Sequence, residues 1–330
     1  MTHVASLYGL TVAAPFPLHV ARPAPRGPVD VQFVLGAPIA ATSDRPPGVV
    51  VVHRPISDEV HATYVRTDDG GYLLRFARTC DFVIDASLGR ITMHMAQDVP
   101  PEMGAVIALG TVLSFVLLLR GDCVLHASAV QVGGHAIGFV GHSGMGKSTM
   151  AALMCADGGR VITDDVLRLT PRDGLPRCAL GATELRLRSA AGALADDLVD
   201  TLGQDVSARS TADERSALQL PTATEEDLEL AALVIPRPRR DLAEVSVTLL
   251  DAKSALLTLI RFPRVVGVVD PVMQGEQFDH LAWLVATVPV YLGDVPWGPP
   301  FPTGTGRALA SLVGASGRVA DPDLSRESAR

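Results

Sequence analysis

The most constraining feature of this chain is a glycine-rich segment between an apolar run and a run of helix-forming residues. The apolar run covers residues 136–140, and the helix-forming run covers residues 149–156. The order predicts a strand, a tight loop and a helix, which is the context that the pattern G-x-x-x-x-G-K-[ST] requires. The segment that fits this pattern reads Gly141-His142-Ser143-Gly144-Met145-Gly146-Lys147-Ser148.

The residue types in this segment suit the binding of a nucleotide's phosphates. Glycines allow the backbone to turn its N–H groups toward an anion, and the following helix adds its positive N-terminus. Lys147 would reach the β- and γ-phosphates of ATP, and Ser148 would bind Mg²⁺. A glycine-rich turn without a ligand would give no reason for Lys147 and Ser148 at this spacing. The predicted nucleotide-binding residues are Gly141, His142, Ser143, Gly144, Met145, Gly146, Lys147, Ser148 and Thr149.

Composition limits the class of protein and its partners. The chain has 330 residues, 48% of them hydrophobic and 19% charged, which suffices for one large domain or two ordinary ones. A net charge of −8 argues against nucleic acid as the main partner, because nucleic-acid-binding proteins usually carry a basic face. The four cysteines are scattered without a C-x-x-C pair, which predicts reduced thiols in a cytoplasmic protein and no zinc site.

One segment raises the question of a membrane. Residues 103–119 form a run of seventeen residues without a charge, at the short limit for a transmembrane helix. The N-terminus carries no recognisable signal peptide. A buried core helix is the better interpretation, because the run leads into the strand before the loop, which must meet cytoplasmic ATP. We therefore expect no membrane contact.

The two halves of the chain differ in their pattern. The first hundred residues are expected to be rich in strands, with hairpins at 64–77 and 82–95. From about residue 121 strands alternate with helices, which indicates an α/β core. The predicted organisation is a small β-rich domain over 1–100, a buried connecting helix over 101–120, an α/β domain built around the loop over 121–302, and a partly disordered tail over 303–330.

The second half contains the elements on which a site would depend. The expected architecture is a mixed sheet flanked by helices. The predicted strands cover 124–132, 136–140, 160–163, 233–235, 245–250 and 288–292, and the predicted helices cover 147–156, 252–262 and 277–286.

Two adjacent carboxylates are the best candidates to work with the loop. Asp164 and Asp165 follow the strand over 160–163 and lie about sixteen residues after Ser148. The C-terminal ends of strands face the ligand in open α/β sheets. One carboxylate could hold Mg²⁺ while the other accepts the proton of an attacking hydroxyl, as phosphoryl transfer requires. A pair of aspartates that only caps a turn is the alternative interpretation.

The order of these motifs resembles the catalytic domain of the HPr serine kinase/phosphorylase family. The resemblance is carried by Leu125-His126-Ala127-Ser128-Ala129-Val130, by the glycine-rich loop, and by Val161-Ile162-Thr163-Asp164-Asp165, and it is specific over residues 123–168. It implies a P-loop α/β fold of the kind found in this family and in ATP-type phosphoenolpyruvate carboxykinase.

The resemblance also implies roles for individual residues. Asp164 matches the general base that acts on the target serine, and Asp165 matches the acidic residue associated with metal. His126, on the strand before the loop, would orient the acidic residues, and Lys147 would act on the transferred phosphate. A histidine in an apolar strand is also often an ordinary core side chain, and that alternative stays open for His126.

A third acidic residue is assigned by a weaker match. The segment Thr183-Glu184-Leu185-Arg186-Leu187 is similar to the family's signature of Leu, Glu, a hydrophobic residue, Arg and Gly. The match implies that Glu184 binds metal and that Arg186 contacts phosphate. Leu187 stands where the family has glycine. The alternative that Glu184 and Arg186 are ordinary surface charges is therefore equally supported.

The predicted function is that of an ATP- and Mg²⁺-dependent serine kinase acting on a protein or peptide. Tyr8-Gly9-Leu10-Thr11-Val12, Asp30-Val31, Gly71-Tyr72-Leu73-Leu74 and the helix before Leu125 resemble stand-alone relatives that often lie near genes for modified peptides such as lasso peptides. HPr is therefore not the obvious substrate. Members of the family assemble, which implies a homo-oligomer. The alternatives are a P-loop ATPase or nucleotide-dependent binding protein without phosphotransfer, and a kinase for free serine or another small molecule.

Overall fold

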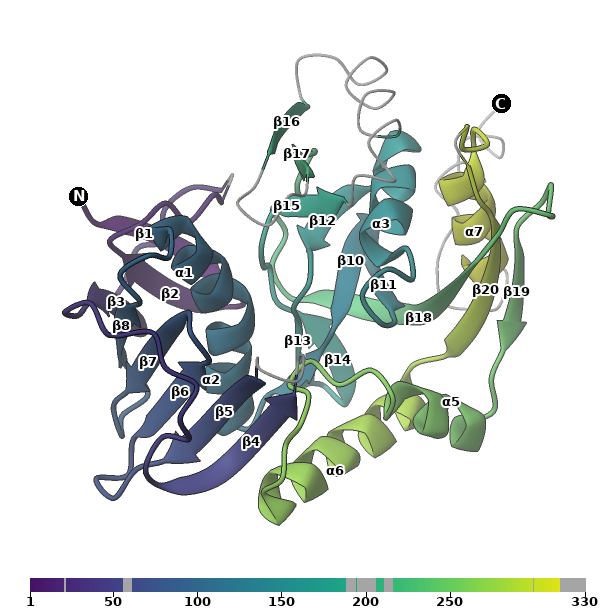
Figure 1. Ribbon diagram of the computed structural model, residues 1–330. Coiled ribbons are helices and arrows are strands. Elements are labelled where there is room, and N and C mark those ends of the chain that lie inside the picture. Colours follow the sequence, from purple (N-terminus) through teal and green to yellow (C-terminus); the bar gives the residue numbers. More distant parts are fainter. Residues whose placement is uncertain are drawn as a thin grey trace. The chain divides into compact units, whose positions relative to one another are not determined.

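The computed structural model describes residues 1–20, 22–55, 61–187, 194, 206–210, 216–298 and 300–314. The chain divides into two compact units (Figure 1). The first contains residues 1–124 and 264–279, and the second contains residues 125–263 and 280–330. The first unit therefore includes the apolar helix that the sequence places between domains, together with a returning segment from the second half.

The first unit is built on an eight-stranded sheet with the order β1-β2-β3-β8-β7-β6-β5-β4. Both predicted hairpins are present, with Arg66 opposite Tyr72 in β5–β6 and Ile84 opposite Ile91 in β7–β8. The strands are β1 His3–Leu7, β2 Leu10–Ala14, β3 Val31–Leu35, β4 Val49–Pro55, β5 His61–Arg66, β6 Tyr72–Phe76, β7 Cys80–Ile84 and β8 Arg90–Met95.

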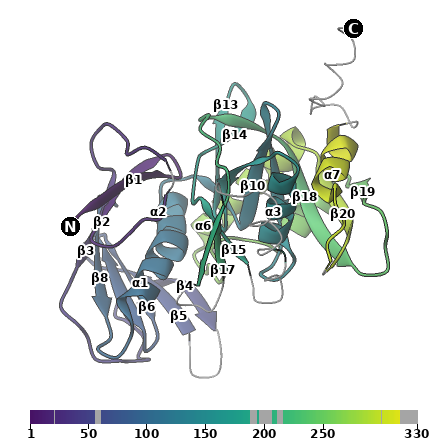
Figure 2. The ribbon, with the colours of Figure 1, turned by 90° about the horizontal axis from the view of Figure 1, so that it is seen from above.

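The apolar segment after this sheet is helical and packs against one of the sheet's faces (Figure 1 and Figure 2). It consists of α1 Pro101–Ile107, a π-helical turn η1 Ala108–Val112, and α2 Leu113–Leu119. The ring of Phe115 lies 5.1 Å from that of Tyr64 and 5.4 Å from that of Tyr72, edge to face. By length and composition the helix could cross a membrane, but half of its most apolar window is buried inside the protein. These contacts are those of a core helix.

The second unit contains a three-stranded sheet and nearly all of a nine-stranded mixed sheet, since the boundary between the units falls inside the short strand over 123–125. In the larger sheet the order is β12-β10-β11-β18-β14-β13-β9, with β20 paired to β18 and β19 to β20. Its strands are β9 Cys123–Leu125, β10 Ala127–Val132, β11 His135–Val140, β12 Arg160–Thr163, β13 Leu167–Arg172, β14 Leu175–Cys178, β18 Leu228–Arg239, β19 Ser246–Leu249 and β20 Val290–Pro296. The smaller sheet has the order β15-β17-β16, with β15 Glu184–Leu187, β16 Ser207–Ser210 and β17 Ser216–Gln219.

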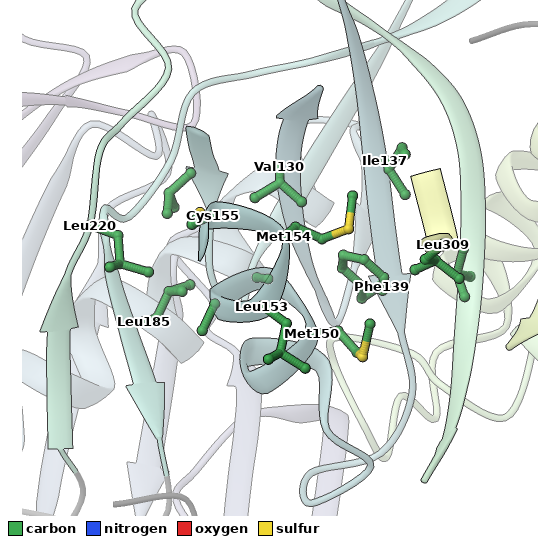
Figure 3. Packing of buried hydrophobic residues seen from close by; sticks show 14 of the residues in the cluster. Val130, Ile137, Phe139, Met150, Leu153, Met154, Cys155, Leu185, Leu220 and Leu309 are labelled. Atoms are coloured by element: carbon green, nitrogen blue, oxygen red, sulfur yellow. The ribbon is translucent and has the colours of Figure 1, made fainter. Parts of the chain in front are cut away.

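Helix α3, Lys147–Ala156, packs between these two sheets. Figure 3 shows Met150 and Met154 of the helix near Phe139 of β11, while Leu185 of β15 lies on another side. A helix with such neighbours is apolar around most of its circumference rather than along one stripe. Eight of its ten residues are buried: Lys147, Thr149, Met150, Ala151, Ala152, Leu153, Met154 and Cys155.

Within the described residues the other helices are α5 Ala252–Leu259, α6 Pro271–Thr287 and α7 Thr305–Gly314. Helix α7 lies in the segment for which partial disorder is predicted, and it packs on α3. A Cβ added at Gly306 would come within 2.7 Å of the Leu153 carbonyl oxygen, so glycine permits this close approach. The Arg307 N–H also donates to Asp157 Oδ2 at 3.0 Å. Residues 315–330 of the predicted tail lie outside the described residues.

Replacing Leu309 with alanine should reveal whether α7 contributes to the fold. Leu309 is fully buried, so its loss should lower the free energy of unfolding by about 2–5 kcal/mol. Leu312→Ala on the same helix is the control, since Leu312 is exposed and its truncation should change stability little. Urea unfolding followed by circular dichroism measures both effects. Equal stabilities for the two variants would contradict the docking of α7.

The four cysteines are free and buried, as the scattered pattern predicts. Burial raises the pKa of the Cys80, Cys123 and Cys155 thiols to about 12, and it raises the pKa of Cys178 as well. Because the thiolate is the reactive form, the native protein should not react with a disulfide reagent at about pH 8. After denaturation, each of the 4 cysteines should react with one equivalent of the reagent. Rapid labelling of a native thiol would contradict this burial.

Candidate functional site

The direction of three strands brings distant parts of the sequence to one edge of the sheet. Strand β10 pairs antiparallel with β11 on one side and with β12 on the other. The C-terminal ends of β11 and β12 therefore lie at the same edge, with the N-terminal end of β10 between them. Ala127 is opposite Val140, the last residue of β11, and Ala129 is opposite Thr163, the last residue of β12. The glycine-rich loop and the two aspartates leave the sheet at this edge.

The loop joins β11 directly to α3, as the sequence predicts. Gly144 and Gly146 have φ angles of 92° and 87°, in the left-handed region that favours glycine. Residues 142–144 are exposed, so the outer curve of the loop faces solvent. No side chain caps the N-terminus of α3, which leaves the N–H groups of its first turn directed toward the loop. The predicted nucleotide-binding residues 141–149 thus form a continuous loop and first helical turn.

Lys147 and His126 are in direct contact. The Lys147 ammonium donates to His126 Nε2 at 3.0 Å and to the His142 carbonyl oxygen at 3.1 Å. An ammonium group can only donate, so His126 Nε2 is the acceptor and the ring proton is on Nδ1. The sequence places His126 inside a strand over 124–132, but this strand is interrupted and His126 forms the bend between β9 and β10. The bend directs its imidazole toward the loop rather than into the core.

Asp164 is the buried centre of the site. Its side chain is 3% exposed and accepts three hydrogen bonds. Oδ1 accepts from Ser128 Oγ at 2.5 Å and from Ser148 Oγ at 2.8 Å, and Oδ2 accepts from the Arg186 N–H at 2.9 Å. These donors compensate for the burial of the carboxylate and fix its orientation. The loop serine is therefore paired with the first of the two aspartates.

Asp165 occupies a different environment from its neighbour. Its φ angle of 68° turns the chain at the end of β12, and its side chain is 41% exposed. His126 Nδ1 lies 3.1 Å from both the carbonyl oxygen and Oδ1 of Asp165. With the tautomer that Lys147 imposes, the Nδ1–H donates to Asp165. A chain of contacts thus runs from Lys147 through His126 to Asp165, separate from the Ser148–Asp164 pair.

The third predicted acidic residue is engaged elsewhere. Glu184, at the start of β15, accepts from Arg209 of β16 at 2.6 and 3.0 Å. Its neighbour Arg186 contributes its backbone N–H to Asp164, a role that a signature based on side chains does not predict. The structure therefore places the Glu184 segment beside the site, with the Glu184 carboxylate in an ion pair.

Ser128 belongs to the site although the sequence gives it no role. It is fully buried and forms the short hydrogen bond to Asp164. A polar residue in the apolar stretch of β10, two positions after His126, is the signal that could have identified it. Both residues reach the aspartates, since Ser128 of β10 contacts Asp164 and His126 of the preceding bend contacts Asp165.

The residues present fit a magnesium ion bound together with a nucleotide. Mg²⁺ prefers oxygen ligands and is usually held by one or two protein groups, with phosphates and water completing its octahedron. Ser148 Oγ and Asp164 Oδ1 are such a pair, 2.8 Å apart. Within the part of the chain that the structure describes, no three His, Cys, Asp or Glu residues are placed to form a metal site made by protein alone.

Comparisons with known proteins leave the assignment open. No family model matches the chain, and no curated protein sequence matches it. Among solved structures, the HPr(Ser) kinase/phosphatase from Coxiella burnetii is similar, with a TM-score of 0.30 and 9% sequence identity over 62% of this chain and 98% of that chain. A TM-score this low does not show a shared fold and gives no ground for assigning a function.

Proposed function

We propose that this protein is an ATP- and Mg²⁺-dependent kinase that transfers the γ-phosphate to a serine hydroxyl of a protein or peptide. One observation carries the proposal: Lys147 and Ser148 of the loop converge at one sheet edge with His126, Asp164 and Asp165. A cradle for phosphates beside a paired hydroxyl and carboxylate, with a second carboxylate nearby, is the set of groups that phosphoryl transfer needs.

Each group has a chemical task in this proposal. The N–H groups of the loop and the Lys147 ammonium hold the phosphates and stabilise charge that develops during transfer. Ser148 and Asp164 would hold Mg²⁺, which neutralises charge on the β- and γ-phosphates when bound. The acceptor oxygen forms a bond to the γ-phosphorus as the bond from that phosphorus to the bridging oxygen of ADP breaks. The hydroxyl proton passes to a carboxylate.

The geometry favours Asp165 as the carboxylate that receives this proton. The resemblance assigns that role to Asp164 and the metal role to Asp165. Asp164 is nearly inaccessible, and both of its oxygens already accept hydrogen bonds, one of them from Ser148. Asp165 is 41% exposed and oriented by His126, so an acceptor hydroxyl can approach it from solvent.

The serine acceptor is proposed from the resemblance over residues 123–168, and the choice of a peptide rather than HPr is proposed from the likeness of the N-terminal half to stand-alone relatives. A serine of a ribosomally made peptide is the acceptor class that we propose, with a cytoplasmic location. Phosphorylation of free serine and hydrolysis of ATP by water are the competing outcomes. Assembly of several copies is a further expectation from the family.

Transfer of labelled γ-phosphate from Mg·ATP is the experiment that tests this function. The acceptors are serine-containing peptides encoded beside the gene, with free serine in a parallel reaction. Labelled phosphoserine in a peptide, absent with Lys147→Ala, is the expected result. Label in free serine would indicate a small-molecule kinase. Free phosphate with no labelled acceptor, still produced by Asp165→Asn, would indicate an ATPase or a nucleotide sensor instead.

A further inference from the structure

Trp297 lies at the same sheet edge as the glycine-rich loop, although it is some 150 residues away in sequence. It directly follows β20, which pairs parallel to β18, and β18 pairs parallel to β11. Parallel strands run toward the same edge, and β20 continues past the level at which β11 ends, because Phe139 pairs with Val234 and Val234 pairs with Tyr291. The residue after β20 therefore reaches the loop that follows β11.

The backbone and ring of Trp297 are fixed from two directions. Its N–H donates to the carbonyl oxygen of Arg239, the last residue of β18, at 2.9 Å. The ring of Phe301 lies 5.2 Å from the indole in an edge-to-face arrangement. The indole also packs against the hydrophobic cluster around α3. These contacts orient the backbone of Trp297 and one side of its partly buried ring.

The outer edge of the indole touches the loop at the residue before α3. A Cβ built on Gly146 would lie 2.4 Å from Cη2 of the indole and 3.0 Å from Cζ2, so a side chain here would force the indole to shift. Gly146 is also in the left-handed region, with a φ angle of 87°. Two independent constraints thus act on one residue, since its conformation favours glycine and the indole lies against it. The next residues are Lys147 and Ser148, whose positions depend on Gly146.

We propose that Trp297 is a positioning residue for nucleotide binding, an inference that rests on the proposed function of the loop. The indole presses against Gly146 and keeps the loop in its binding-competent conformation before the nucleotide arrives. Without the indole, the competent conformation would be populated only part of the time. Apparent affinity falls in proportion to that population, while the rate at saturation is little changed because bound phosphates restore the loop.

Two substitutions and one control test this role. Trp297→Ala removes the contact, and Trp297→Phe keeps a ring for Phe301 but lacks the outer atoms that touch Gly146. Trp283→Phe is the control, because Trp283 is the other tryptophan of the chain and lies within α6. Calorimetric titration with Mg·ADP should give a Kd that is about 5- to 50-fold higher for the Trp297 variants and unchanged for the control. With Mg·ATP, KM should rise by a similar factor while kcat stays within about threefold.

A spectroscopic readout complements the affinities. In Trp283→Phe the only tryptophan is Trp297, and its emission should change when Mg·ADP occupies the loop. Thermal unfolding shows which variants fold, and Trp297→Phe carries the test if Trp297→Ala does not. Wild-type affinity in folded Trp297 variants, or emission that does not respond to bound Mg·ADP, would overturn the inference about Trp297 and leave the proposed function standing. If the wild-type protein binds neither Mg·ADP nor Mg·ATP, the proposed function fails as well.

Discussion

Replacing Lys147 with alanine is expected to lower the rate of γ-phosphate transfer by about 10²–10³-fold. The ammonium group is the positive charge that the loop would direct at the transferred phosphate. Lys147 as a whole is 6% exposed, so water cannot readily take its place. The variant also loses the hydrogen bond to His126 and with it part of the orientation of Asp165. Initial rates of peptide phosphorylation at saturating Mg·ATP measure the effect.

The chain offers a matched control for this substitution. It contains only one other lysine, Lys253, which is exposed near the start of α5. Lys253→Ala changes the net charge by the same amount and should leave the rate unchanged. A Lys147→Ala protein that folds and still transfers phosphate at the wild-type rate would refute the assignment of the loop.

Replacing Asp164 with asparagine is expected to have a similarly large effect, about 10²–10³-fold on phosphate transfer. The amide is nearly isosteric but neutral, so it removes the charge that Ser148 faces while most of the packing remains. The harsher Asp164→Ala change leaves donors from Ser128, Ser148 and Arg186 without an acceptor, which should lower the stability by about 1–3 kcal/mol. Asp173→Asn, at the exposed turn between β13 and β14, is the control.

The dependence of nucleotide affinity on Mg²⁺ separates the roles of the two aspartates. If Asp164 faces the metal, Asp164→Asn should weaken Mg·ADP binding while leaving the affinity for metal-free ADP nearly unchanged. Asp165→Asn should then slow transfer with little effect on either affinity. The reverse pattern would restore the assignment that the family resemblance implies. Calorimetric titrations with and without Mg²⁺ distinguish the two patterns.

The sequence predicts best what depends on local signals. Helix α3 begins at Lys147 and ends at Ala156, as expected, because the loop glycines and the Gly158-Gly159 pair mark its limits. Strand β18 extends well beyond the predicted 233–235. Pro236 and Pro238 make the sequence suggest an earlier end, because proline is rare inside a strand that is paired on both sides. In the structure both prolines lie beyond the part of β18 that pairs with β11, where, among the described strands, only β20 is paired with it.

Contacts that depend on strand order could not be predicted in the same way. The pairing of Ser148 with Asp164 rather than Asp165 follows from the register of β10 against β12, which no spacing in the sequence encodes. The role of Ser128 follows from the same register. The ion pair of Glu184 with Arg209 depends on β15 and β16 being joined through β17. A sequence motif identifies these residue types but not the residues that they contact in the folded protein.

The three bonds of Asp164 also bear on how the protein folds. They join it to residues that are 36, 16 and 22 positions away in the chain, in three different elements. None of these contacts can form by local collapse, because each requires a loop of the chain to close first. The site should therefore assemble late, together with the packed sheets, and loss of activity on adding denaturant should coincide with the cooperative unfolding of the second unit.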